Sequence, residues 1–119
     1  MAKQVVQIDP GGGSPELELQ FGDANIGVYR VFRWDSNGNP AHLAVDAAGK
    51  VPLGPAAELP GATISYETII QSPKSAPDQR YSLTVLIQQD GRVVSISERG
   101  KLNPDGATSF IGFITFQRL

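Results

Sequence analysis

Apolar and polar residues alternate along most of this chain, and glycine or proline interrupts the alternation at short intervals. Residues 16–21, Glu-Leu-Glu-Leu-Gln-Phe, show the pattern most simply, because every second side chain is apolar. Successive side chains of an extended chain point to opposite faces, so a period of two predicts strands with one buried face. No window sustains the period of about 3.6 residues that an amphipathic helix requires. The sequence therefore predicts an all-β protein.

The strand pattern recurs in about eight segments, as expected for a small sandwich. These expected strands cover residues 4–8, 16–21, 26–34, 41–46, 62–70, 81–89, 92–98 and 108–118. The 119 residues suit one domain, spanning 1–119. We therefore expect a two-sheet antiparallel β-sandwich, immunoglobulin-like or jelly-roll in type, with a closed β-barrel as the alternative.

The two halves of the chain resemble each other faintly. A turn with Asn-Gly or Asp-Gly is followed by an alternating run, a Gly-Lys pair, a Gly-Ala-Thr triplet and a final apolar run, in the same order in both halves. This order predicts a pseudo-twofold repeat of residues 26–71 and 81–117. The alternative is that such turns recur wherever hairpins recur, because they need positive φ.

Composition excludes several classes of partner. The net charge is −2 and the ten Lys and Arg residues are scattered without a run, so we expect no nucleic-acid partner. No apolar stretch is long enough to span a membrane, so we expect no membrane partner. The chain has no cysteine, and its first residues lack the apolar run of a signal peptide. These features predict a cytoplasmic protein, with a trimmed leader as the alternative.

A cluster of flat and polar side chains marks the turn after the third expected strand. Indole rings stack on the C–H faces of sugars, while carboxylate, amide and guanidinium groups bond the hydroxyls. This chemistry predicts a ligand site for carbohydrate formed by Arg33, Trp34, Asp35, Asn37 and Asn39. The alternative is that Trp34 closes the rim of the core, as large amphipathic side chains often do.

No constellation in the sequence indicates catalysis or metal binding. His42 is the single histidine, and metal sites usually gather several His or Cys ligands. Glu67, in the middle of an expected strand, is interpreted as an outward-facing residue because Thr63 and Ser65 share its face. We therefore predict no catalytic residue, no metal site and no cofactor.

Three local predictions concern backbone geometry. Asn37-Gly38 favours a type I′ hairpin turn. In the strand that follows, alternation places Ala41, Leu43 and Val45 inward and His42 outward. Gly112, in the middle of the last strand, indicates a bulge or a close backbone approach.

Two strands, 26–34 and 108–118, carry apolar residues on both faces, which is more than a half-buried sheet needs. Surplus apolar surface marks partner interfaces, so we expect a homo-oligomer, most simply a symmetric dimer. The leading functional hypothesis is a non-enzymatic, lectin-like binding module with a glycan ligand. The alternative is a structural assembly subunit, such as a phage or secretion-apparatus component, and a small enzyme of unknown reaction ranks third.

Overall fold

The computed structural model describes residues 2–22, 26–72 and 80–119. Strands dominate it, and a single turn of 3-10 helix lies in the long connection before β6. In chain order the elements are β1 (Ala2–Ile8), β2 (Glu16–Phe21), β3 (Ile26–Trp34), β4 (Pro40–Ala47), β5 (Val51–Pro52), η1 (Ala56–Glu58), β6 (Thr63–Gln71), β7 (Arg80–Gln89), β8 (Arg92–Lys101) and β9 (Ala107–Arg118). These described ranges contain no helix long and apolar enough to cross a membrane.

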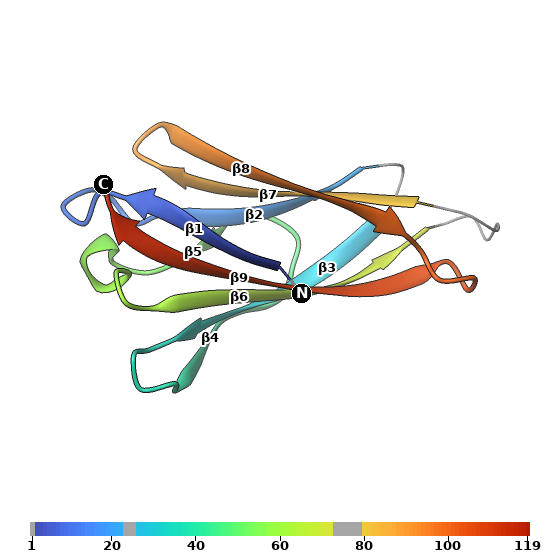
Figure 1. The fold of residues 1–119 in the computed structure, drawn as a ribbon, viewed down its shortest axis with the longest axis horizontal. Helices are drawn as coiled ribbons and strands as arrows, with labels where there is room; N and C mark the ends of the chain where they lie inside the picture. The colour runs from blue at the N-terminus through green and yellow to red at the C-terminus, as the bar shows by residue number, and fades with distance from the viewer. Residues whose placement is uncertain (1, 23–25, 73–79) are drawn as a thin grey trace.

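The strands form two packed sheets, as Figure 1 shows. The five-stranded sheet has the order β1-β9-β6-β3-β4, and the four-stranded sheet has the order β5-β2-β7-β8. All pairings are antiparallel except that of β1 with β9, which joins the two ends of the chain in parallel. The predicted β-sandwich is confirmed, and the described strands do not close into a barrel.

The core lies between the sheets and is built from every second residue of the central strands. Ile64, Tyr66 and Ile70 of β6 are fully buried and belong to the same core cluster as Leu83 and Val85 of β7 in the other sheet. A smaller aromatic group closes the end of the core near the end of β8. It consists of Tyr66 stacked on Phe110, with ring centroids 6.1 Å apart, and Tyr81 edge-on to Phe110 at 6.4 Å.

Gly112 of β9 allows this aromatic packing. It is paired with Tyr66 in register, without a bulge, and a Cβ at this position would overlap the Tyr66 ring. The structure therefore shows no bulge at Gly112, and what approaches the glycine closely is a tyrosine ring rather than another backbone segment.

The two tight hairpins use different turns. Asp90 and Gly91 both have positive φ, 50° and 79°, as a type I′ turn between β7 and β8 requires. In the β3–β4 turn only Gly38 has positive φ, so the predicted type I′ geometry at Asn37-Gly38 is wrong. The Asp35 carboxylate accepts hydrogen bonds from the backbone N–H groups of Asn37 and Asn39, and this local bonding selects a longer turn.

The alternation predicted for β4 is also wrong in part. The pairing of β3 with β4 shifts register twice, between Tyr29 and Val31 and between Val31 and Phe32. Each extra residue in β4 reverses the faces of those that follow. Val45 is consequently 57% exposed on the outer side of the sheet, although strict alternation placed it in the core.

The two halves of the chain pair differently. The β3–β4 hairpin and β6 belong to one sheet, where β6 pairs with β3. The β7–β8 hairpin lies in the four-stranded sheet, whereas β9 pairs with β6 and β1 in the other sheet. The repeat of 26–71 and 81–117 stays a prediction from sequence.

Candidate binding face on the five-stranded sheet

The outer face of the five-stranded sheet, turned away from the core, is strongly apolar. Among the residues whose side chains the structure describes, seven large hydrophobic residues are exposed, and five of them lie on this face. Those five are Val5, Val28, Val45, Ile69 and Ile111. Partly buried Phe32, Trp34 and Phe113 belong to the same face by register. We call this surface, with the residues between them, the apolar face.

Register places these side chains in rows that run across the strands. One row contains Ile111, Glu67 and Arg30 on β9, β6 and β3, and the neighbouring row contains Ile69 opposite Val28. Val45 of β4 borders the same region, because it lines one hollow together with Arg30 and Ile111. The rows therefore form one continuous surface across four strands.

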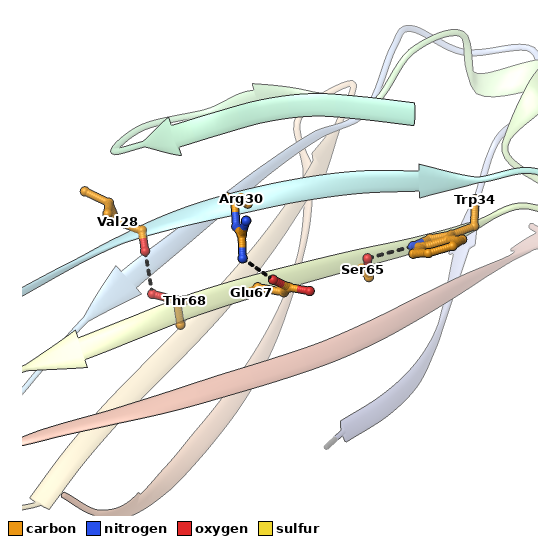
Figure 2. Close-up of polar contacts among 6 residues, drawn as sticks. All are labelled: Val28, Arg30, Trp34, Ser65, Glu67 and Thr68. Carbon is orange, nitrogen blue, oxygen red and sulfur yellow. Dashed lines mark hydrogen bonds and ion pairs between the residues drawn. The ribbon is translucent and has the colours of Figure 1, made fainter. Parts of the chain in front are cut away.

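The aromatic end of the apolar face is held by polar contacts. The Trp34 indole Nε1–H donates a 2.8 Å hydrogen bond to Ser65 Oγ, and Figure 2 shows the ring lying across β6 beside Ser65. Ser65 is buried although it lies on the outer side, which is consistent with the indole above it. Phe32 lies between Trp34 and His42. The Phe32 and Trp34 ring centroids are 6.5 Å apart, and the His42 ring meets Phe32 edge-on at a centroid distance of 4.6 Å. The indole is thus fixed in orientation.

An ion pair occupies the middle of the apolar face. Arg30 Nη2 lies 2.7 Å from Glu67 Oε2, and Figure 2 shows the two side chains reaching toward each other between β3 and β6. The Arg30 guanidinium also lies 5.9 Å from the Phe32 ring centroid. Both charged groups keep substantial solvent exposure, so the pair stabilises the isolated fold little.

Two shallow hollows lie on the apolar face. The hollow around the Arg30–Glu67 pair has a volume of about 460 Å³ and is bordered by Val28, Ile69 and Ile111. A second hollow of about 530 Å³ lies toward β1, where Val5 and Phe113 meet the hydroxyls of Thr63 and Thr115. Apart from the Arg30–Glu67 pair in the first hollow and Lys3 in the second, the two hollows are lined mainly by apolar and hydroxyl-bearing side chains, so the surface is suited to binding by shape and burial of apolar area.

The predicted ligand residues do not converge on one side of the sheet. Trp34 lies on the apolar face, whereas Arg33 lies on the opposite side, where its Nη2 is 3.1 Å from Glu58 Oε2. Neighbours in a strand point to opposite faces, and this alternation separates the two side chains. The part of the predicted site that accompanies Trp34 is therefore the turn, not Arg33.

Within the turn, the Asp35 carboxylate accepts hydrogen bonds from backbone N–H groups. One carboxylate oxygen accepts 2.9 Å bonds from the N–H groups of Asn37 and Asn39, and the other accepts a 3.4 Å bond from Asn39 Nδ2. The bond from the Asn39 N–H, followed by the other turn donors, lowers the pKa of Asp35. Asn37 and Asn39 are exposed, as are Asp35 and Ser36, so the whole turn that follows Trp34 presents polar residues to solvent.

The outer face of the four-stranded sheet is different. It carries the carboxylates and amides of β2 and the hydroxyl and basic side chains of β7 and β8. These residues are Glu16, Glu18, Gln20, Ser82, Thr84, Gln88, Ser95, Ser97, Arg99 and Lys101. Val93 and Leu86, diagonal neighbours on β8 and β7, are the apolar residues among them. This face resembles the ordinary solvated surface of a sandwich.

Sequence reasoning missed several members of the apolar face. It expected Val45 inside, and it considered neither Ser65 as the partner of Trp34 nor Phe113 as its neighbour across the sheet. The apolar residues on both sides of 26–34 and 108–118 were the available signal. The bulges that turn Val45 outward left no signal in the alternation.

Buried titratable chemistry lies elsewhere. Burial, followed by the charge of Glu98, raises the pKa of Tyr66 to about 12, and the same two causes raise the pKa of Tyr81. Across residues 2–22, 26–72 and 80–119, no group of three or more His, Cys, Asp or Glu side chains is placed to hold a metal ion. Comparison with known protein families, curated proteins and solved structures finds no match to this chain.

Proposed function

We propose that this protein is a non-enzymatic interaction module that docks its apolar face against a protein surface. The observation that supports this function most directly is the concentration of exposed aliphatic side chains on one of two otherwise comparable sheets. Monomeric soluble proteins rarely leave a contiguous apolar patch of this kind in water, and such patches mark interaction sites. The assembly-subunit hypothesis drawn from the sequence is a case of this function.

The energetics favour a covered face. A fully buried Val or Ile side chain contributes roughly 1.5–3 kcal/mol relative to an exposed one. Covering the five half-exposed side chains with a partner would therefore contribute several kcal/mol to binding. Trp34 and Phe32 add the aromatic character that is enriched at interface centres. The Arg30–Glu67 pair supplies the polar contacts that select a particular partner.

A site-specific photo-crosslinker tests the proposal in the cells that produce the protein. A benzophenone side chain at position 69, on the apolar face, should yield discrete crosslinked protein bands. The same group at position 93, on the outer face of the four-stranded sheet, is the matched control, because Val93 is 54% exposed and Ile69 is 59% exposed. Equal labelling from both positions would contradict the proposal.

Carbohydrate binding is the second candidate function. The specific observation in its favour is the fixed orientation of Trp34, whose ring lies on a solvent-facing sheet surface beside the amide-bearing turn. Because the chain has one tryptophan, its fluorescence reports this site alone. Titration with a panel of soluble oligosaccharides should change the emission if the hypothesis is correct, and Asn39→Ala should weaken the change. Unchanged emission with every sugar would remove this candidate.

A further inference from the structure

We infer that the surface docked on the apolar face is the apolar face of a second copy of this chain, in a two-fold symmetric dimer. This inference rests on the proposed function and names its partner. The symmetry axis runs parallel to the strands, midway between β3 and β6. Each β3 then lies over β6 of the second copy, and each β4 lies over the side of the sheet that contains β9.

Charge complementarity selects this axis. Arg30 and Glu67 are directly opposite each other on β3 and β6, so a rotation about a line between these strands exchanges their positions. Arg30 of each copy then faces Glu67 of the other, and the four groups form an alternating network. Buried charges are tolerated only when paired, and this arrangement gives each charge two opposite partners.

The apolar residues follow the same symmetry. The row through the ion pair has Ile111 on one side and Val45 on the other, so the axis brings Ile111 of one copy over Val45 of the second. In the next row Ile69 and Val28 exchange in the same way. The same axis therefore brings apolar side chains onto apolar side chains and charged groups onto groups of opposite charge.

The size and shape of the face suit such a dimer. Five strands about 4.8 Å apart, with a rise of about 3.4 Å per residue, give a surface roughly 24 Å wide and 27 Å long. In this dimer β1 of each copy extends beyond β4 of the other, so four strands overlap, over roughly 19 Å by 27 Å or about 500 Å² in projection. This is small beside the roughly 800 Å² that a standard interface buries on each partner, so we expect self-association at micromolar concentrations. Face-to-face sheets pack with their strand directions within about 30°, and an axis parallel to the strands produces this aligned packing.

Cysteine pairs test the predicted contacts, and the absence of native cysteine gives a clean background. Variants Val45→Cys and Ile111→Cys are purified separately, mixed and treated with a short bismaleimide. Such a reagent suits sheets that pack about 10 Å apart, a separation too large for a disulfide. The mixture should crosslink at least ten times faster than either variant alone. A mixture of Val45→Cys with Val93→Cys is the control and should not crosslink.

Charge reversal tests the symmetry in a second way. Arg30→Glu and Glu67→Arg should each weaken self-association at least tenfold, because each places like charges together. An equimolar mixture of the two variants should recover association as a heterodimer, since every facing pair is then opposite in sign. Recovery on mixing also shows that both variants are folded.

The outcomes separate this inference from the proposed function. If the wild-type chain stays monomeric at high micromolar concentration, the second copy is not the partner and the inference fails. The crosslink from position 69 in cells then still decides the proposed function, because a band of a different mass identifies another protein on the same face. Association that persists unchanged in both charge variants would overturn the predicted symmetry.

Discussion

The two sheets of this sandwich share one core but differ on their outer faces. The outer face of the four-stranded sheet is mostly polar, with Leu86 and Val93 as a small apolar pair. That of the five-stranded sheet carries a continuous apolar surface around one ion pair. The central strands of both sheets alternate in the same way toward the core, so packing of the core alone does not explain the difference. We therefore expect the outward-facing residues of the five-stranded sheet to carry the function.

The sheets also differ in how tightly a glycine is packed. A Cβ at Gly112 would overlap the ring of Tyr66, which is fully buried, whereas a Cβ at Gly100 would overlap the ring of Tyr81, which is partly exposed and able to move. We expect Gly112→Ala to lower the free energy of unfolding by about 3 kcal/mol and Gly100→Ala by about 1 kcal/mol or less. Urea denaturation measures both. Equal losses would show that the two sheets pack equally tightly.

The outer faces should respond differently to a single charge. Ile69→Lys should weaken self-association at least ~100-fold, about 2.7 kcal/mol, because the dimer would bury two unpaired ammonium groups. Val93→Lys, a matched change on the other sheet, should leave association unchanged. Both positions are more than half exposed, so each variant should unfold within about 0.5 kcal/mol of the wild type. Sedimentation velocity measures association, and a similar loss in both variants would contradict the difference between the faces.

Alkaline pH should affect the two sheets unequally. Burial raises the pKa of Tyr66 from 10 to about 12, so between these pH values the unfolded chain releases a proton that the folded chain retains. This group therefore makes stability fall as the pH rises through that window. Tyr66→Phe should make the fall shallower, and Tyr81→Phe should do so less, because Tyr81 is partly exposed. Chemical denaturation at several pH values tests this order, and equal slopes in the wild type and Tyr66→Phe would contradict it.

The smallest expected effect concerns the ion pair in the monomer. A double-mutant cycle with Arg30→Met and Glu67→Gln, measured at a concentration where the chain is monomeric, should give a coupling of about 0.5 kcal/mol. The same cycle measured on association should give a larger coupling, because the dimer removes the pair from water. Equal couplings in both measurements would indicate that the pair stays solvated.

Much of the fold could be predicted from the sequence because the alternation of apolar and polar residues is regular. The bounds of 16–21 and 26–34 were predicted as observed, and the assignment of Glu67 to an outward face is confirmed by its contact with Arg30. Predictions failed where local bonding overrides the period of two. The Asp35 carboxylate selects the turn, and the register shift between Phe32 and Val31 turns Val45 outward before the next shift restores the original faces.

The candidate binding face could be predicted only in part from the sequence. Apolar residues on both sides of 26–34 and 108–118 indicated a surplus, and the structure places these strands two positions apart in one sheet. The order of strands in a sheet depends on long-range pairing that leaves no local pattern. The grouping of Val45, Ile69 and Ile111 around one ion pair therefore could not be derived from sequence.

Hydroxyl-radical footprinting of the wild-type chain, from nanomolar to high micromolar concentration, tests the central claim most directly. We predict that oxidation of Trp34 and Phe113 falls as the concentration rises, while oxidation of Leu86 and Val93 stays constant. Concentration-independent oxidation on both faces, or protection of the four-stranded sheet instead, would contradict the claim.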